Sequence, residues 1–116
     1  MLEKNLKLAQ KAAREAGSVA MRYFKTSLYD IKDKSYNNPV TTADHKANQV
    51  IKDILFEDGS IYGWLSEETV DSKERLKKDY VWVVDPIDGT KEFIEGVSQF
   101  TISIALVCKG DPIIGV

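Results

Sequence analysis

Two carboxylates, Asp85 and Asp88, stand close together in the run Val-Trp-Val-Val-Asp-Pro-Ile-Asp-Gly-Thr at residues 81–90. Pro86 fixes its own φ and biases Asp85 towards an extended backbone, while Gly89 permits geometries that other residues reach only with strain. This turn should therefore be rigid and hold both acids near each other. Such a pair is electrostatically costly unless a cation lies between the acids or one of them is protonated. A hard divalent metal ion is the first hypothesis for the turn.

A second apolar run also ends on acids. Residues 61–65 predict a short strand, which is followed directly by Ser-Glu-Glu-Thr at residues 66–69. Because parallel and mixed sheets gather their sites at strand ends, Glu67, Asp85 and Asp88 are candidates for one oxygen site, and the carbonyl of Ile87 could join them. Magnesium prefers such hard oxygen ligands. Acids and glycines also form ordinary turns, however, and that explanation fits either cluster alone equally well.

An anion could bind beside the acids. The backbone amides of Gly89 and Thr90 precede a predicted helical turn at residues 91–95, and amides at such a position can receive phosphate oxygens. A metal site next to a phosphate site suits in-line hydrolysis of a phosphate ester, in which one ion activates water and another neutralises the leaving oxygen. The pattern therefore points to phosphate chemistry.

Composition narrows the class of protein. The 116 residues carry 16 basic and 18 acidic side chains that are well mixed, which argues against binding to a nucleic acid polymer. Membrane insertion is not expected, because a bilayer-spanning helix needs about 20 apolar residues and no segment of the sequence approaches that length. The single cysteine, Cys108, fits a buried strand thiol in a reducing cytoplasm. His45, the only histidine, has no metal-binding partner and is predicted to be an exposed helix residue.

The elements that would position these residues can be placed from hydrophobic periodicity. A long amphipathic helix is expected at residues 2–26, then a polar connection with a short hairpin near 32–37. A second helix should start at Thr42 as N-cap, with Asp44 in its first turn, where the helix dipole alone would explain an acid. The predicted buried stripes are Leu6, Ala9, Ala13, Ala16, Ala20 and Phe24 on the first helix, and Ala43, Ala47, Val50, Ile51, Ile54 and Leu55 on the second.

The second half of the chain predicts mainly strands. Residues 81–84 should form a buried strand that leaves the core at Asp85, and residues 100–108 another. Residues 70–79 are highly charged and should form a loop or a short helix. The final apolar run, residues 112–116, has nothing to cover it, so the chain is expected to be cut off inside its sheet.

Several ordered motifs together resemble the inositol monophosphatase family of magnesium-dependent, lithium-sensitive phosphatases. They are Pro-Val-Thr-Thr-Ala-Asp at 39–44, Trp-Leu-Ser-Glu-Glu at 64–68, Asp-Pro-Ile-Asp-Gly-Thr at 85–90 and Ile-Gly-Val at 114–116. The resemblance implies an α+β fold, a layered α/β sandwich of the inositol monophosphatase and fructose bisphosphatase type. Residues 1–116 would be the N-terminal portion of that domain.

The resemblance also implies roles for individual residues. Magnesium would be bound by Glu67, Asp85, the Ile87 carbonyl and Asp88, with Glu68 as an acid near the metals; the complete site would hold two or three ions and be inhibited by lithium. Thr90 with Asp44 would orient and deprotonate the attacking water, Gly89 and Thr90 would bind phosphate, and Lys34 would lie in a mobile loop.

Within the family, Leu-Ser-Glu-Glu at 65–68 and Asp-Gly-Thr-Lys-Glu-Phe at 88–93 are most similar to CysQ-type 3'(2'),5'-bisphosphate nucleotidases. The expected substrate is adenosine 3',5'-bisphosphate, with inositol monophosphatase activity as the alternative. The Trp-Asp motif that completes the family's second metal site has no counterpart here. The chain could therefore be the N-terminal portion of an active phosphatase, either as a fragment or as one piece of a split enzyme with a complementing C-terminal chain, or it could be a catalytically inactive remnant. Family members often form homodimers.

Overall fold

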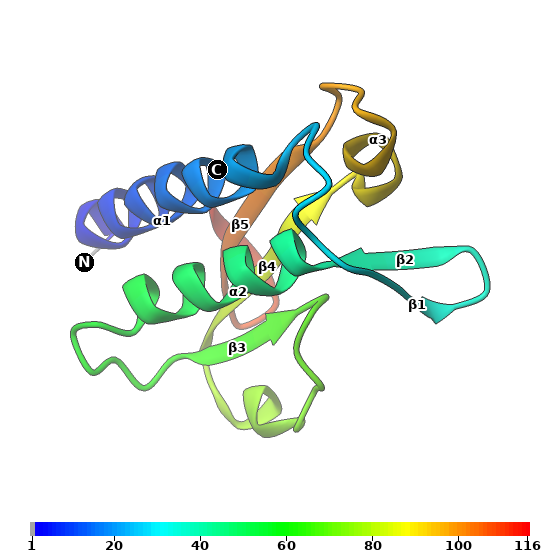
Figure 1. The fold of residues 1–116 in the computed structure, drawn as a ribbon. Coiled ribbons are helices and arrows are strands. Elements are labelled where there is room, and N and C mark those ends of the chain that lie inside the picture. Colours follow the sequence, from blue (N-terminus) through cyan, green and yellow to red (C-terminus); the bar gives the residue numbers. More distant parts are fainter. Residues whose placement is uncertain (1) are drawn as a thin grey trace.

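Two helices cover one face of a four-stranded mixed sheet in the computed structural model, which describes residues 2–116 (Figure 1). The helices are α1 (Leu2–Tyr23) and α2 (Thr42–Leu55), and they lie against each other. The sheet has the order β3-β4-β5-β6, with bounds Gly63–Ser66, Tyr80–Asp88, Thr101–Cys108 and Asp111–Gly115. Strand β3 is parallel to β4, and the other neighbours are antiparallel. The predicted α+β layered arrangement is confirmed.

Three smaller elements surround this body. Strands β1 (Ile31–Ser35) and β2 (Asn38–Thr41) form an antiparallel hairpin that projects beside the start of α2 (Figure 1). The 3-10 helix η1 (Glu74–Lys77) follows β3, and the single-turn helix α3 (Thr90–Glu95) follows β4. The hairpin, the short helix between residues 70 and 79 and the turn ending at Gly96 agree with the sequence predictions.

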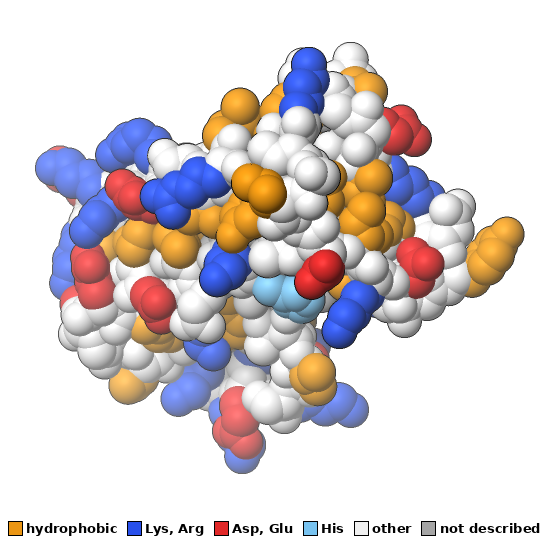
Figure 2. Space-filling view, in the orientation of Figure 1, with side chains coloured by type: hydrophobic (Ala, Val, Ile, Leu, Met, Phe, Trp, Pro, Cys, Tyr) orange, Lys and Arg blue, Asp and Glu red, His pale blue; other side chains and the backbone are white. Residues whose placement is uncertain are grey.

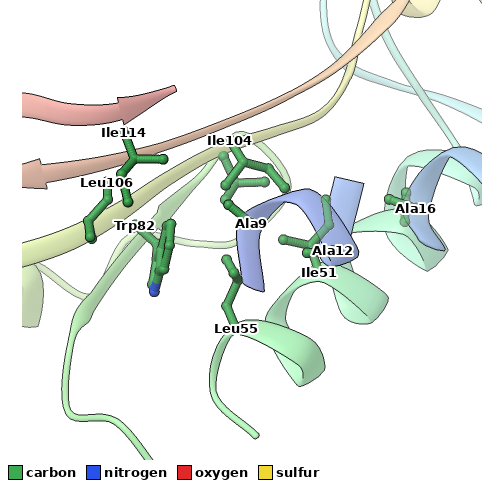
Figure 3. Packing of buried hydrophobic residues seen from close by; sticks show 11 residues of the cluster. Ala9, Ala12, Ala16, Ile51, Leu55, Trp82, Ile104, Leu106 and Ile114 are labelled. Atoms are coloured by element: carbon green, nitrogen blue, oxygen red, sulfur yellow. The ribbon is translucent and has the colours of Figure 1, made fainter. Parts of the chain in front are cut away.

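The core forms between the inner face of the sheet and the two helices. Alternate strand residues point inwards, which is the period of two expected for a strand with one buried face, and small alanines on α1 allow close approach. Figure 3 shows this packing. The cluster comprises Ala9, Ala12, Ala16, Ala47, Ile51, Leu55, Trp82, Val84, Ile104, Leu106 and Ile114.

The first helix ends earlier and is rotated relative to the prediction. It stops at Tyr23, because Lys25 takes a left-handed φ of 60° and the Thr26 hydroxyl donates to the Tyr23 carbonyl. Leu6, placed in the buried stripe, is 37% exposed, whereas Asn5 is buried and its amide donates to the Tyr62 hydroxyl. A hydrogen-bonded polar side chain therefore occupies the position assigned to an apolar one.

The second helix and its neighbouring strand also differ in detail. The N-cap of α2 is Thr41, not Thr42, because its hydroxyl accepts from the Asp44 amide. Val50 and Ile54 are only half-buried. Strand β3 begins at Gly63, and Ile61, predicted to open it, is 78% exposed.

Strand β4 runs further than predicted. It continues to Asp88 with an irregularity after Asp85, and both Pro86 and Ile87 are buried, so the chain does not leave the core at Asp85. Ile87 is held by a second apolar cluster that includes Phe93. Cys108, predicted to be buried, is half-buried at the end of β5.

The surface carries interspersed charges. Figure 2 shows basic and acidic side chains mixed on one face, with His45 exposed as predicted. Within residues 2–116, no helix combines the length and the apolar character needed to cross a membrane.

Candidate active site

The two acidic turns lie side by side because β3 and β4 are parallel and in register. Ser66 pairs with Val84, and the Glu67 amide donates to the Val84 carbonyl at 3.2 Å, so Glu67 follows its strand next to Asp85. A cavity of about 270 Å³ opens here. Its lining comprises Lys34, Asn38, Pro39, Asp44, Glu67, Glu68, Asp85, Ile87, Gly89, Thr90, Lys91 and Glu92. The structure thus brings nearly all predicted site residues to one place.

A larger cavity of about 410 Å³ lies between the hairpin and α2. Asp30 is the only acidic residue among those that line it, with Lys32, His45 and Lys46. We take the smaller cavity as the candidate site, because clustered carboxylates carry the chemistry.

Asp44 and Thr90 form a hydrogen-bonded pair at this cavity. The Thr90 hydroxyl donates to Asp44 Oδ1 at 2.8 Å, and it also lies 3.2 Å from the Ile87 carbonyl. Asp44 Oδ2 accepts from the Thr41 amide at 2.8 Å and from the Thr41 hydroxyl at 2.6 Å. Asp44 is only 1% exposed. The acid therefore serves as part of the helix cap and as the partner of Thr90 at the same time.

Lys34 reaches the second acidic turn from the hairpin. Its ammonium nitrogen lies 2.6 Å from Glu68 Oε1 and 3.9 Å from Glu67 Oε2. Desolvation lowers the pKa of Lys34, but the hydrogen bond to Glu68 and the charges of Glu68, Glu67 and Asp44 outweigh it, so the pKa lies above its usual value. The side chain stays charged and neutralises part of the acidic cluster.

Burial and the neighbouring negative charges both act on the carboxyl group of Asp85. Burial, followed by the negative charges of Asp88, Glu67, Glu68 and Asp44, raises the pKa of Asp85 from 3.8 to about 6. A raised carboxylate pKa among other acids is typical of a site that receives a cation.

A pH-dependent stability follows for the metal-free chain. The folded state binds the Asp85 proton more tightly than the unfolded chain does, so this group favours folding below pH 3.8, and the contribution is lost as pH rises through about 6. The Asp85→Asn variant should not lose this stability as the pH rises, because its side chain is neutral at every pH. Thermal denaturation in EDTA should show the variant gaining stability over the unmodified chain more at pH 8 than at pH 4.5. An equal difference at both pH values would contradict the raised pKa.

The candidate ligands have the chemistry that a hard cation prefers, but they are not arranged around one metal position. All the candidate ligands are oxygens, and Glu68 Oε2 is buried without a hydrogen-bond partner among residues 2–116. Asp88 is exposed and does not line the cavity. In the part of the chain that the structure describes, no three His, Cys, Asp or Glu side chains are arranged so that they could hold one metal ion. Side-chain movement or further ligands would be needed to complete a magnesium site.

Gly89 is required by backbone geometry and by space. Its φ is +98°, and a Cβ built on it would lie 3.0 Å from the Gln99 carbonyl oxygen and 3.3 Å from Phe100 Cα. Backbone atoms cannot move aside as the end of a flexible side chain can. Only glycine therefore lets the turn before α3 approach the start of β5.

We expect Gly89→Ala to be more destabilising than the matched change Gly110→Ala. Gly110 has a similar φ of +87° but open space around it, so alanine there should cost only the strain, about 1–2 kcal/mol. At Gly89 the backbone clash adds to that strain. Chemical denaturation of both variants measures the difference in free energy of unfolding, and equal losses would show that the close contact is unimportant.

Sequence reasoning missed several residues that line or hold the site. Asn38, Pro39, Lys91 and Glu92 line the cavity, but the sequence assigned them no role, although the last three lie within motifs that carried the family resemblance. Thr41 could have been found, since Thr-x-x-Asp at residues 41–44 has the spacing of a capping box, with Asp in place of the usual Glu.

Comparison with known proteins shows which family the chain belongs to. The sequence model described as "Inositol monophosphatase family" matches residues 1–116. The chain belongs to the inositol monophosphatase family. It is 44% identical over 106 residues to the 3'(2'),5'-bisphosphate nucleotidase CysQ of Escherichia coli K12, a match that covers 90% of this chain and 43% of that protein.

Two further proteins are similar to the chain. The chain is 42% identical over 103 residues to the chloroplastic bifunctional phosphatase IMPL2 of Arabidopsis thaliana, covering 89% of this chain and 30% of that protein. The crystal structure of the extragenic suppressor protein suhB from Bartonella henselae superimposes with a TM-score of 0.86 at 29% identity, covering 95% of this chain and 43% of that one. The chain spans less than half the length of these relatives.

Proposed function

We propose that residues 1–116 are the N-terminal portion of a magnesium-dependent phosphate monoester hydrolase. The observation that carries the proposal is the hydrogen bond from Thr90 to Asp44. Both residues line the same cavity as Glu67, Glu68 and Asp85. A hydroxyl with a buried carboxylate partner, placed beside clustered acids, suits the delivery of water to a phosphate held by a cation.

In this proposal magnesium would be bound by Glu67, Asp85, Asp88 and the Ile87 carbonyl, with Glu68 close by. Bound magnesium would favour deprotonation of water and neutralise charge on the leaving oxygen. Family resemblance supports two or three ions in the complete site and inhibition by lithium. The donor chemistry and the buried, unpartnered Glu68 Oε2 support a cation at this position.

Thr90 and Asp44 would orient the attacking water and accept its proton. Thr90 Oγ1 can accept a hydrogen bond from water while donating its own proton to Asp44 Oδ1, so the pair forms a short path for a proton from water to the carboxylate. The two Thr41 donors fix Asp44 while this occurs. Gly89 and Thr90 would contact the phosphate, and Lys34 would adjust the charge of the acidic turn.

We propose adenosine 3',5'-bisphosphate as the substrate, with loss of its 3'-phosphate to give AMP. Support comes from the 44% identity to CysQ proteins over nine-tenths of the chain. Inositol monophosphatase activity is the second candidate, because the matching family model carries that description. A catalytically inactive remnant, or one piece of a split enzyme, is the alternative from a different class.

Phosphate release with and without magnesium tests these possibilities. The polypeptide would be incubated with adenosine 3',5'-bisphosphate and, in parallel, with inositol 1-phosphate, and lithium would be added to any active mixture. We expect faster release from the nucleotide in a longer or complemented protein, and little or none from the 116-residue chain. Activity of the chain alone would overturn the remnant hypothesis, and a preference for inositol 1-phosphate would overturn the nucleotidase assignment. Dimerisation and a cytoplasmic location stay predictions.

A further inference from the structure

A buried polar network lies next to the acidic turn and is not explained by the chemistry above. Asn48 and Ser66 are only 9% and 6% exposed. The Ser66 hydroxyl donates to Asn48 Oδ1 at 2.5 Å, and Asn48 Nδ2 donates to the Thr69 hydroxyl oxygen at 3.0 Å. The Trp64 indole nitrogen donates to the same Thr69 oxygen at 3.0 Å. The asparagine therefore uses both its acceptor and its donor.

The hydrogen bonds of this network lie on both sides of the two glutamates along the chain. Residues 66–69 form a turn in which the Thr69 amide donates to the Ser66 carbonyl at 3.3 Å and the Glu68 amide donates to the Ser66 hydroxyl at 3.2 Å. Ser66 and Thr69 are the two ends of the turn, and Asn48 connects their side chains. The positions of Glu67 and Glu68 are thus set by bonds made on either side of them.

One helix holds both halves of the cavity. Asn48 follows Asp44 by four residues, so both project from the same face of α2. Asp44 contacts the turn after β4 through Thr90, and Asn48 contacts the turn after β3 through Ser66 and Thr69. The helix therefore fixes the spacing of the two acidic turns.

We infer that Asn48, acting through Ser66 and Thr69, is a positioning residue that holds Glu67 and Glu68 in place to receive a cation. The metal-binding part of this inference rests on the proposed function, whereas the positioning part concerns the turn alone. An asparagine suits the task because aspartate would lose the Nδ2 donor to the Thr69 oxygen and add a negative charge beside the acidic cluster. The side chain has no contact with the cavity itself, since it is absent from its lining.

Amide hydrogen exchange and indole NMR signals test the positioning part without metal. In Asn48→Ala we expect exchange at the amides of Glu67, Glu68 and Thr69 to rise at least about tenfold, and the Trp64 indole signal to shift because its acceptor is no longer held. The chain has only two tryptophans, and Trp82 Nε1 makes no hydrogen bond within residues 2–116, so its signal is an internal reference. Unchanged exchange and an unmoved Trp64 signal would overturn the inference.

Gln49→Ala is the matched control, because Gln49 is the next residue on α2 and its exposed side chain bonds to no residue other than Asp53 within 2–116. It should leave the turn unchanged. If Asn48→Ala does not fold, Thr69→Val removes the shared acceptor at nearly constant shape and should give the same local change. Exchange that rises equally over the whole chain in a folded variant would indicate a general loss of stability, and would overturn a positioning role.

Calorimetric titration with Mg²⁺ tests the metal part. Residues that orient metal ligands typically change affinity by about 10- to 100-fold, and we expect a loss in that range for Asn48→Ala and none for Gln49→Ala. Equal Mg²⁺ affinity in both variants would overturn the metal part of the inference. If the unmodified chain binds no Mg²⁺, the proposed metal site of this chain fails, while the exchange data still decide whether Asn48 holds the turn.

Discussion

Asp44→Asn should lower kcat/KM of the active protein by about 10²- to 10⁴-fold, the range for loss of a positioned proton acceptor. The Thr41 amide can only donate, so the variant's amide oxygen must stay on that side. The amide nitrogen would then face Thr90 Oγ1, which could no longer donate its proton there. The path for the proton would be broken while the shape of the side chain is kept.

The same substitution should cost some stability. The two Thr41 donors already share Asp44 Oδ2 and would keep that oxygen as an uncharged acceptor, whereas the Thr90 hydroxyl would lose its carboxylate acceptor, which we expect to reduce the free energy of unfolding by about 1–3 kcal/mol. Steady-state kinetics and chemical denaturation measure the two effects. Asp53→Asn is the matched control, because Asp53 is exposed on the same helix and should change stability by less than about 0.5 kcal/mol. Activity of Asp44→Asn within a few-fold of the unmodified protein would refute the proton path.

Asp88→Asn should remove most of the turnover, by at least about 10²-fold, while the fold stays intact. Asp88 is exposed and takes part in no ion pair within residues 2–116, so its replacement removes no contact from the core. Loss of a metal ligand should also raise the magnesium concentration needed for half-maximal activity. A magnesium titration of phosphate release, together with a melting curve, measures both.

Glu95→Gln is a suitable control for Asp88→Asn, since it removes an exposed carboxylate from the end of α3 without approaching the cavity. It should leave the magnesium requirement unchanged. This comparison matters because Asp88 does not line the cavity, and its assignment as a ligand comes from resemblance to the family. An unaltered magnesium dependence in Asp88→Asn would refute that assignment.

Much of the architecture could be predicted because the signals are local. The continuous β-branched and aromatic run at residues 81–84 predicted a buried strand, and the spacing of Ala43, Ala47 and Ile51 predicted a helix. Errors arose where a polar side chain found a distant partner. Asn5 is buried in place of Leu6 because Tyr62, 57 residues away, accepts its hydrogen bond.

The chemistry of the site was only partly readable from residue order. Acids after two strands indicated an oxygen-rich site, and the parallel pairing of β3 with β4 makes them neighbours. The sequence could not show that Pro86 and Ile87 remain buried, because Ile87 packs with Phe93 in a separate apolar cluster. It also gave no role to Asn48, whose partners Ser66 and Thr69 lie on another element.

By itself, the sequence determined the helices and strands, the two acidic turns and the resemblance to the family, since each depends on residues close together in the chain. Only the tertiary structure decided which side chains meet. Thr90 reaches Asp44 across 46 residues and Lys34 reaches Glu68 across 34, and both contacts depend on how α2 and the hairpin pack beside the sheet. Such distances are fixed by burial and strand register, which no local pattern contains.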